Sequence, residues 1–144
     1  MKIKLFNPPI PIHNLIKYCS AFFLISLSLG TSAIAQTPYN QKITGTTAGK
    51  INTADCGFIG QSPHHVINLT QQVYSLHLKV EANQGKPTLL IIGPNNGDRT
   101  CILGDVSGGK LPEMGGVWSS GQYFIYVGDL NGNQYPFTLN ITDR

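Results

Sequence analysis

The chain has 144 residues and a formal net charge of +3, but three of its ten basic residues lie within the first 17 positions. Residues 36–144 carry seven basic and seven acidic side chains, with no basic run. Nucleic-acid binding requires clustered Lys and Arg to displace counterions from phosphates, so the composition argues against a nucleic-acid partner. The length after position 35 predicts one domain with a modest hydrophobic core.

The first 35 residues have the pattern of a secretory signal peptide. Lysines precede the apolar stretch Ala21–Leu29, and Ala33–Ala35 has the small-x-small form of a cleavage site. The apolar stretch is shorter than the roughly 20 residues that a membrane-spanning helix needs. We expect residues 1–35 to be removed before Gln36, which leaves a secreted or periplasmic protein without a membrane span. The alternative is an N-terminal membrane anchor.

Two cysteines, Cys56 and Cys101, follow the leader. In an exported domain such a pair most often forms a disulfide. A redox pair and a metal site are the alternatives. The sequence has no C-x-x-C, and two thiolates are too few for a closed zinc site. We therefore expect a structural bridge that closes a long loop and stabilises the fold by up to about 4 kcal/mol.

The region after the leader begins with polar, weakly β-forming sequence. Residues 36–54 predict an N-terminal extension with one poorly defined strand at Ile43–Ile51, which is rich in Thr and Gly. Residues 55–144 are expected to form the folded domain. Asn52–Gly60 is expected to be a turn that the Cys56 bridge holds in place.

The middle of the chain alternates apolar and polar residues, as half-buried strands do. A strand is expected within His64–Thr70, and Val73–Glu81 gives the clearest pattern. Four of its side chains are expected to face the core: Tyr74, Leu76, Leu78 and Val80. Pro87–Cys101 predicts a strand, a turn and a returning strand.

The last third continues with turns and short strands. A glycine-rich loop is expected at Gly104–Gly116, followed by a short strand or bend at Val117–Ser120. Strands are expected at Gln122–Gly128 and Pro136–Thr142, and the Asn-Gly pair at 131–132 between them is a hairpin signal. No helical period follows the leader. Strands at intervals of about ten residues, with turn residues between them, indicate a β-sandwich or barrel.

Several short motifs follow one another in a characteristic order between Asp55 and Thr142. In chain order they are the strand with Leu76, Leu78 and Val80, G-x-P-T-L at Gly85–Leu89, G-P-N-N-G at Gly93–Gly97, Cys101, Asp105, Trp118, S-G-Q-Y-F-I-Y-V-G at Ser120–Gly128 and P-F-T-L-N-I at Pro136–Ile141. This order resembles the bacterial pre-peptidase C-terminal domain, and more closely its stand-alone exported relatives with two cysteines. The resemblance implies an all-β fold, a jelly-roll-like antiparallel β-sandwich of about 7–9 strands.

The resemblance also implies a non-catalytic role. Members of that family are taken to assist secretion and solubility, or to bind a substrate or surface. Some bind calcium through paired acidic residues soon after the cysteine, where this chain has Leu103, Gly104 and a single Asp105. Oxygen ligands could come from Asp105, Glu113 and Asp129 if two loops meet. We expect no cofactor, with calcium as the alternative.

A hydrolase would need a nucleophile, a base and an orienting group within reach of one another. Ser62, His64 and His65 are close in sequence, but they surround Pro63 in a turn, and no G-x-S-x-G elbow is present. Adjacent histidines on a strand point to opposite faces. We therefore expect no enzyme activity, and a small hydrolase is the least favoured function.

Binding is better supported, by apolar residues outside the expected core. Phe124 and Tyr126 lie opposite the core-facing side of their strand, and Leu90 and Ile92 do the same in theirs. If these strands share a sheet, its outer side carries an apolar patch, unless the N-terminal segment or the glycine-rich loop covers it. Trp118 is either a core anchor or an exposed stacking platform.

Together these residues predict a non-enzymatic module, secreted or periplasmic, that binds a protein, peptide or glycan at the cell envelope. The surface would be the Phe124 and Tyr126 face or the loops around Trp118. The alternative is a structural or secretion-assisting, chaperone-like module for a peptidase.

Overall fold

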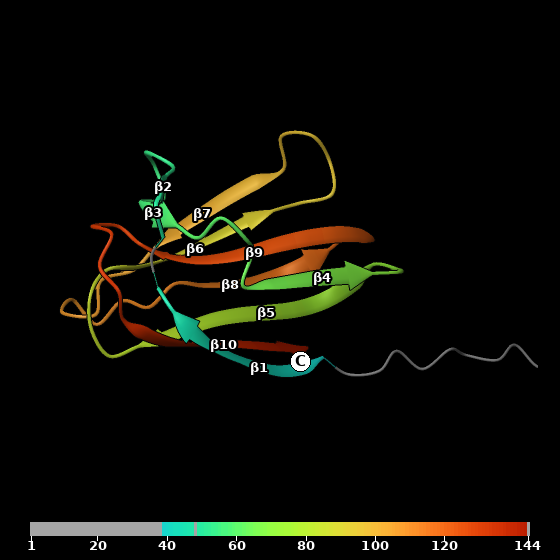
Figure 1. Cartoon of the computed structure of the whole chain (residues 1–144). Coiled ribbons are helices and arrows are strands. Elements are labelled where there is room, and N and C mark those ends of the chain that lie inside the picture. The colour runs from blue at the N-terminus through green and yellow to red at the C-terminus, as the bar shows by residue number, and fades with distance from the viewer. Residues whose placement is uncertain (1–38, 48, 144) are drawn as a thin grey trace, which may run out of the picture. The chain divides into compact units, whose positions relative to one another are not determined.

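The computed structural model describes residues 39–47 and 49–143, which form ten β-strands and no helix (Figure 1). The strands build two antiparallel sheets that enclose a common core, so the predicted all-β sandwich is confirmed. The expected leader, residues 1–35, lies outside the described residues. Nothing in the described part of the chain forms a helix that could cross a bilayer.

The two sheets differ in size. Sheet A has the strand order β1-β10-β5-β8. Its strands are β1 (Asn40–Thr46), β10 (Pro136–Asp143), β5 (Val73–Ala82) and β8 (Glu113–Trp118). Sheet B has the order β2-β3-β9-β6-β7, and β4 pairs with β9 on the side opposite β6. Its strands are β2 (Ile51–Asn52), β3 (Phe58–Ile59), β9 (Gly121–Asp129), β6 (Pro87–Ile92), β7 (Arg99–Leu103) and β4 (His65–Leu69).

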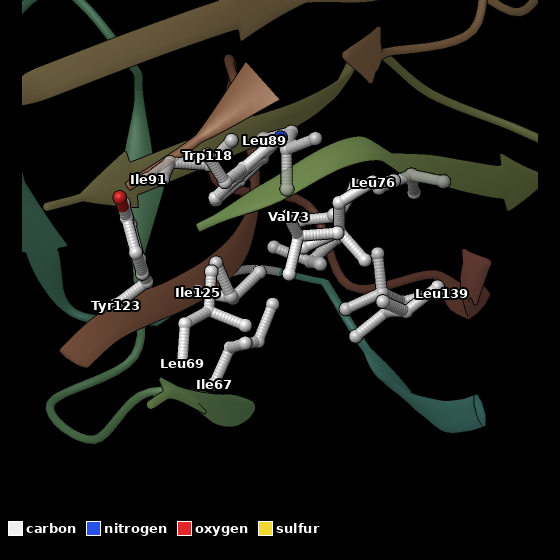
Figure 2. Close-up of a cluster of buried hydrophobic side chains, with 14 of the residues drawn as sticks. Ile67, Leu69, Val73, Leu76, Leu89, Ile91, Trp118, Tyr123, Ile125 and Leu139 are labelled. Carbon is white, nitrogen blue, oxygen red and sulfur yellow. The ribbon is translucent and has the colours of Figure 1, made fainter. Parts of the chain in front are cut away.

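The core lies between the inner faces of the two sheets (Figure 2). Alternate residues along each strand point into it, because successive side chains of a strand point to opposite faces. Leu78 and Leu139 from sheet A and Leu89 and Ile125 from sheet B are fully buried. The edge strands β7 and β8 carry more exposed residues than the central strands do.

The N-terminal extension expected at residues 36–54 is part of the sandwich. β1 pairs with β10 along its whole length, from Asn40 opposite Thr142 to Thr46 opposite Pro136. Most of its side chains are exposed because it is an edge strand, which explains its weak apolar signal. The structure therefore has no domain boundary between residues 54 and 55, and the described residues belong to one unit.

Two local predictions on sheet A need correction. A register shift between Val73 and Leu76 places Val73 in the core and leaves Tyr74 76% exposed. A bulge of this kind changes which side chains point into the core, so the alternation before the bulge is out of phase with the alternation after it. The glycine-rich loop that was expected to reach Gly116 ends earlier, because β8 begins at Glu113 and pairs with β5.

Candidate functional site

The two cysteines form the predicted disulfide, which holds a short segment on the outer face of sheet B. Cys56 and Cys101 are bridged, with 5.7 Å between their Cα atoms. The Thr53 hydroxyl accepts the Cys56 N–H at 3.1 Å, and the buried Thr88 hydroxyl on β6 donates to the Cys56 carbonyl at 2.9 Å. Residues 53–57, called the disulfide segment below, are therefore attached to the sheet by a covalent bond and a hydrogen bond.

The disulfide segment covers part of the apolar patch expected on this face. Leu90 is 1% exposed and packs with Cys56 and Ile59 in a cluster separate from the main core. Ile92 and Tyr126 pack against the margin of that cluster and are half-buried. Leu90 therefore presents no surface to a partner. Its cover is this segment, and not the N-terminal segment or glycine-rich loop that the sequence suggested.

A row of apolar side chains remains half-exposed beside the disulfide segment. Val66 on β4 pairs with Phe124 on β9, and Phe124 pairs with Ile92 on β6. Each of the three is half-buried, and we call them the outer row. Phe124 and Ile92 are expected on this outer face from sequence, whereas Val66 joins them through the pairing of β4 with β9 and could have been identified from the alternation within β4.

A charged pair lies at one end of the outer row. Arg99 on β7 is the ladder partner of Ile92, and its guanidinium donates to the two Asp55 carboxylate oxygens at 2.5 and 2.8 Å. The hydrogen bond from Arg99 and its charge lower the pKa of Asp55, and Asp55 raises the pKa of Arg99 in turn. Both groups are solvent-exposed, so the pair adds little to stability. The ion pair places polar groups without net charge at this end of the outer row.

Trp118 belongs to the core and is not an exposed platform. It is 3% exposed, and its ring makes an edge contact with Tyr123 at 4.8 Å between centroids (Figure 2). The Tyr123 hydroxyl donates to the Ser119 carbonyl at 3.0 Å. The indole N–H of Trp118 is also buried, but it has no acceptor among the described residues. A buried donor without a partner costs about 1–3 kcal/mol, so this position is energetically unusual.

A groove of about 320 Å³ opens beside Trp118, where the two sheets end at β7 and β8. Its apolar lining consists of Ile91, Met114, Val117, Trp118 and Tyr123. Asp98, Arg99 and Thr100 add polar groups. Burial raises the pKa of Tyr123, and the charge of Asp98 adds to this shift. Polar atoms contribute more than apolar atoms to the surface of the groove, so the groove offers a ligand both hydrogen-bonding groups and apolar side chains.

The residues considered for a hydrolase do not form a catalytic triad. Nδ1 of His64 accepts the backbone N–H of Val127 at 3.1 Å, and its ring packs edge-on against Phe137. Burial lowers the pKa of both His64 and His65. Ser62 is exposed. His64 is therefore engaged as a structural acceptor within the sandwich.

The three acidic residues considered as calcium ligands do not form one site. Asp129 is buried, and its carboxylate accepts three backbone N–H groups at 2.8 to 3.1 Å. Asp105 accepts the Ser107 hydroxyl at 2.5 Å within its own turn, and Glu113 is exposed on β8. In the part of the chain that the structure describes, no group of three or more His, Cys, Asp or Glu side chains could hold a metal ion.

These features define a disulfide-linked antiparallel β-sandwich with a groove at its open side. No family model matches the chain, and no solved structure matches it. Its sequence is 38% identical over 118 residues to the uncharacterised protein Synpcc7942_2126 of Synechococcus elongatus, an alignment that covers 80% of this chain and 84% of that protein. The chain belongs to the same family as that protein.

Proposed function

We propose that this protein is an exported, non-catalytic β-sandwich module that binds a protein or peptide at the cell envelope through the groove between β7 and β8. The observation that carries the proposal is the groove itself. It combines apolar side chains, among them Met114 and Tyr123, with polar groups of Asp98, Arg99 and Thr100. A glycan is less well matched, because the buried ring of Trp118 offers no face on which a sugar could stack.

Export is supported by two independent features. Residues 1–35 have the pattern of a signal peptide, and disulfides such as Cys56–Cys101 persist mainly in oxidising compartments. We therefore propose a secreted or periplasmic location after cleavage before Gln36. N-terminal sequencing of the protein from a bacterial host that expresses the whole chain tests this. A stable product that still begins within residues 1–35 would contradict it.

The motif order that resembles the pre-peptidase C-terminal domain supports a second candidate function. In that case the module would assist the secretion or solubility of a separately encoded peptidase. Co-expression with a peptidase from a neighbouring reading frame should then raise the exported yield of that peptidase. An unchanged yield would leave the binding function as the better account.

Selection from a phage-displayed library of random linear peptides tests the main proposal. The bait is the protein purified after expression of the whole chain. We expect enriched peptides to bind the wild type and to lose about tenfold or more in affinity for Val117→Arg, because Val117 is 63% exposed and lines the groove. Ile51→Arg is the matched control, since Ile51 is exposed on β2. Absence of enrichment, or equal binding by Val117→Arg, would contradict the proposal.

A further inference from the structure

We infer that β8 takes up an extended peptide segment as a fifth strand of sheet A, with alternate side chains of that peptide entering the groove. The inference rests on the proposed function, and it adds the conformation of the partner and the backbone groups that bind it. Sheet A ends at β8. One edge of this strand therefore faces no other strand among the described residues.

The free backbone groups on β8 follow from its register with β5. The Val80 N–H donates to the Pro112 carbonyl at 2.9 Å, which makes these two residues a hydrogen-bonded pair. Hydrogen-bonded and non-hydrogen-bonded pairs alternate along an antiparallel ladder. Met114 therefore turns its backbone groups toward β5, and Glu113 and Gly115 turn theirs away from it. The outward N–H and C=O groups recur at every second residue, which is the spacing at which another antiparallel strand would form hydrogen bonds.

The edge of β8 lacks most of the features that prevent strand addition. Proteins commonly protect edge strands with lysine, proline or a bulky charged side chain. After Glu113 at its start, β8 has no charged residue and no proline, and Gly115 and Gly116 are exposed without a side chain to obstruct a neighbour. The opposite edge of sheet A is different, because β1 carries Lys42 near its middle.

The groove provides space for the side chains of the added strand. Met114 and Trp118 of β8 both line it, so residues on the same face of an adjacent strand would lie beside them. Alternate residues of a strand share a face, and a peptide with an apolar residue at every second position therefore fits best.

An extended polypeptide is the occupant whose chemistry matches this edge. Each outward residue offers one N–H and one C=O, and a peptide strand returns the complementary pair at the same spacing. Sugar hydroxyls do not repeat in this way. A second copy of this chain, which would add its own β8, is the competing occupant, and the test below separates the two.

The first experiment alters the backbone of the peptide and leaves its side chains unchanged. The most enriched peptide from the selection above is synthesised with N-methyl groups either on its odd-numbered or on its even-numbered amides. Strand addition uses the amides of one edge only, so one form should lose about tenfold or more in affinity and the other less than about threefold. Equal losses in both forms, or none, would overturn strand addition. Groove binding would still stand if Val117→Arg abolishes capture.

The second experiment alters β8. Glu113→Pro removes one outward N–H and should spare the β5 ladder, since proline is tolerated where the N–H faces solvent. Glu113→Thr is the matched control, because it removes the same charge and keeps the N–H. We expect weaker peptide binding for Glu113→Pro only, and equal binding by both variants would overturn the inference.

Sedimentation of the peptide-free protein distinguishes the competing occupant. A monomer supports the peptide assignment, and a dimer that Glu113→Pro dissociates would overturn it in favour of a second copy. Circular dichroism checks that each variant folds. If Glu113→Pro does not fold, the N-methylated peptides on the wild-type protein decide the question.

Discussion

Nδ1 of His64 accepts a hydrogen bond from the backbone N–H of Val127, with 3.1 Å between the two nitrogens. This contact fills a gap along one edge of β9. β4 pairs with β9 as far as Ile125, and β3 pairs with it again at Asp129. The Val127 N–H lies between these two strands, and the imidazole takes the place of the backbone acceptor that neither strand provides. A side chain thereby makes the ladder on this edge continuous.

Acid should destabilise the protein through this contact. Burial lowers the pKa of His64 below its ordinary value of 6.5, and the Thr46 carbonyl opposes the shift only in part. A histidine with a lowered folded-state pKa contributes its full stability above the unfolded pKa. That contribution is lost as the pH falls from about 6.5 through the folded pKa. We expect the free energy of unfolding in urea to decline between about pH 7 and about pH 5.

His64→Asn is the control for this effect, because its amide oxygen can accept the Val127 N–H and does not titrate. Its unfolding free energy should change less over the same pH range. His65, whose pKa is also lowered by burial, is present in both proteins. His64→Phe removes the acceptor and should cost about 1–3 kcal/mol at neutral pH. Identical pH profiles for the wild type and His64→Asn would assign the acid effect to other groups.

Removal of the disulfide should destabilise the outer face of sheet B. The bridge joins residues 45 positions apart, and the double variant Cys56→Ser/Cys101→Ser should lose up to about 4 kcal/mol. Guanidinium titrations measure this loss. A reducing agent should lower the midpoint of the wild type toward that of the double variant and leave the double variant unchanged. A wild-type midpoint that does not respond to complete reduction would refute this prediction.

Asp129→Ala should be strongly destabilising. The buried carboxylate accepts the N–H groups of Lys86, Asn131 and Asn133, and so connects the loop after β9 to the start of β6. Its loss leaves these donors without their charged acceptor, at a cost of about 3 kcal/mol or more. Asp105→Ala is the comparison, since the Asp105 carboxylate makes its hydrogen bonds to Ser107 and Gly108 of its own turn, and it should cost less than about 1 kcal/mol. Similar losses for the two variants in urea would contradict this account.

Trp118→Phe should lower the free energy of unfolding by less than the smaller volume of the phenylalanine ring suggests. Phenylalanine removes the buried indole N–H that has no acceptor among the described residues, and it keeps an aromatic ring beside Tyr123. We expect an unfolding free energy within about 1 kcal/mol of the wild type, against a loss of about 3–5 kcal/mol for Trp118→Ala. A cost for phenylalanine close to that of alanine would show that ring packing outweighs the unpaired donor.

Serine substitutions should separate surface from core on the outer face of sheet B. Tyr126 packs against the cluster beneath the disulfide segment, whereas Phe124 lies in the outer row. Tyr126→Ser should therefore cost about 2–3 kcal/mol and Phe124→Ser about 1 kcal/mol. Thermal unfolding measures both. Capture of a partner that is lost in Phe124→Ser but kept in Val117→Arg would move the binding surface from the groove to the outer row.

The regular part of the sandwich could be predicted from sequence. Alternation along β5, β9 and β10 specifies which side chains face the core, and residues such as Leu78, Ile125 and Leu139 are buried accordingly. The edge strands were harder to predict. β1 contacts the core on one side only, and β8 contains two glycines that are typical of a loop. The exposure of Tyr74 depends on a register shift that local sequence does not encode.

The groove could not be predicted, although one residue of its lining was identified. The sequence leaves Trp118 as either a core anchor or an exposed platform, and the structure shows that it is buried at the margin of a groove. Other lining residues, such as Ile91 and Met114, come from different sheets. They lie beside one groove only because β7 and β8 are the edge strands of the two sheets on the same side of the sandwich. The unpaired indole N–H likewise depends on what surrounds the ring in three dimensions.

The position of the Cys56–Cys101 bridge over Leu90 has a consequence for the timing of folding. In a reducing compartment the disulfide segment would be held over Leu90 by non-covalent contacts alone. The apolar side chains beneath the segment would then be exposed more often and could associate with other proteins. Formation of the disulfide would fix the segment over these side chains. The solvent exposure of Leu90 would therefore distinguish oxidised from reduced molecules.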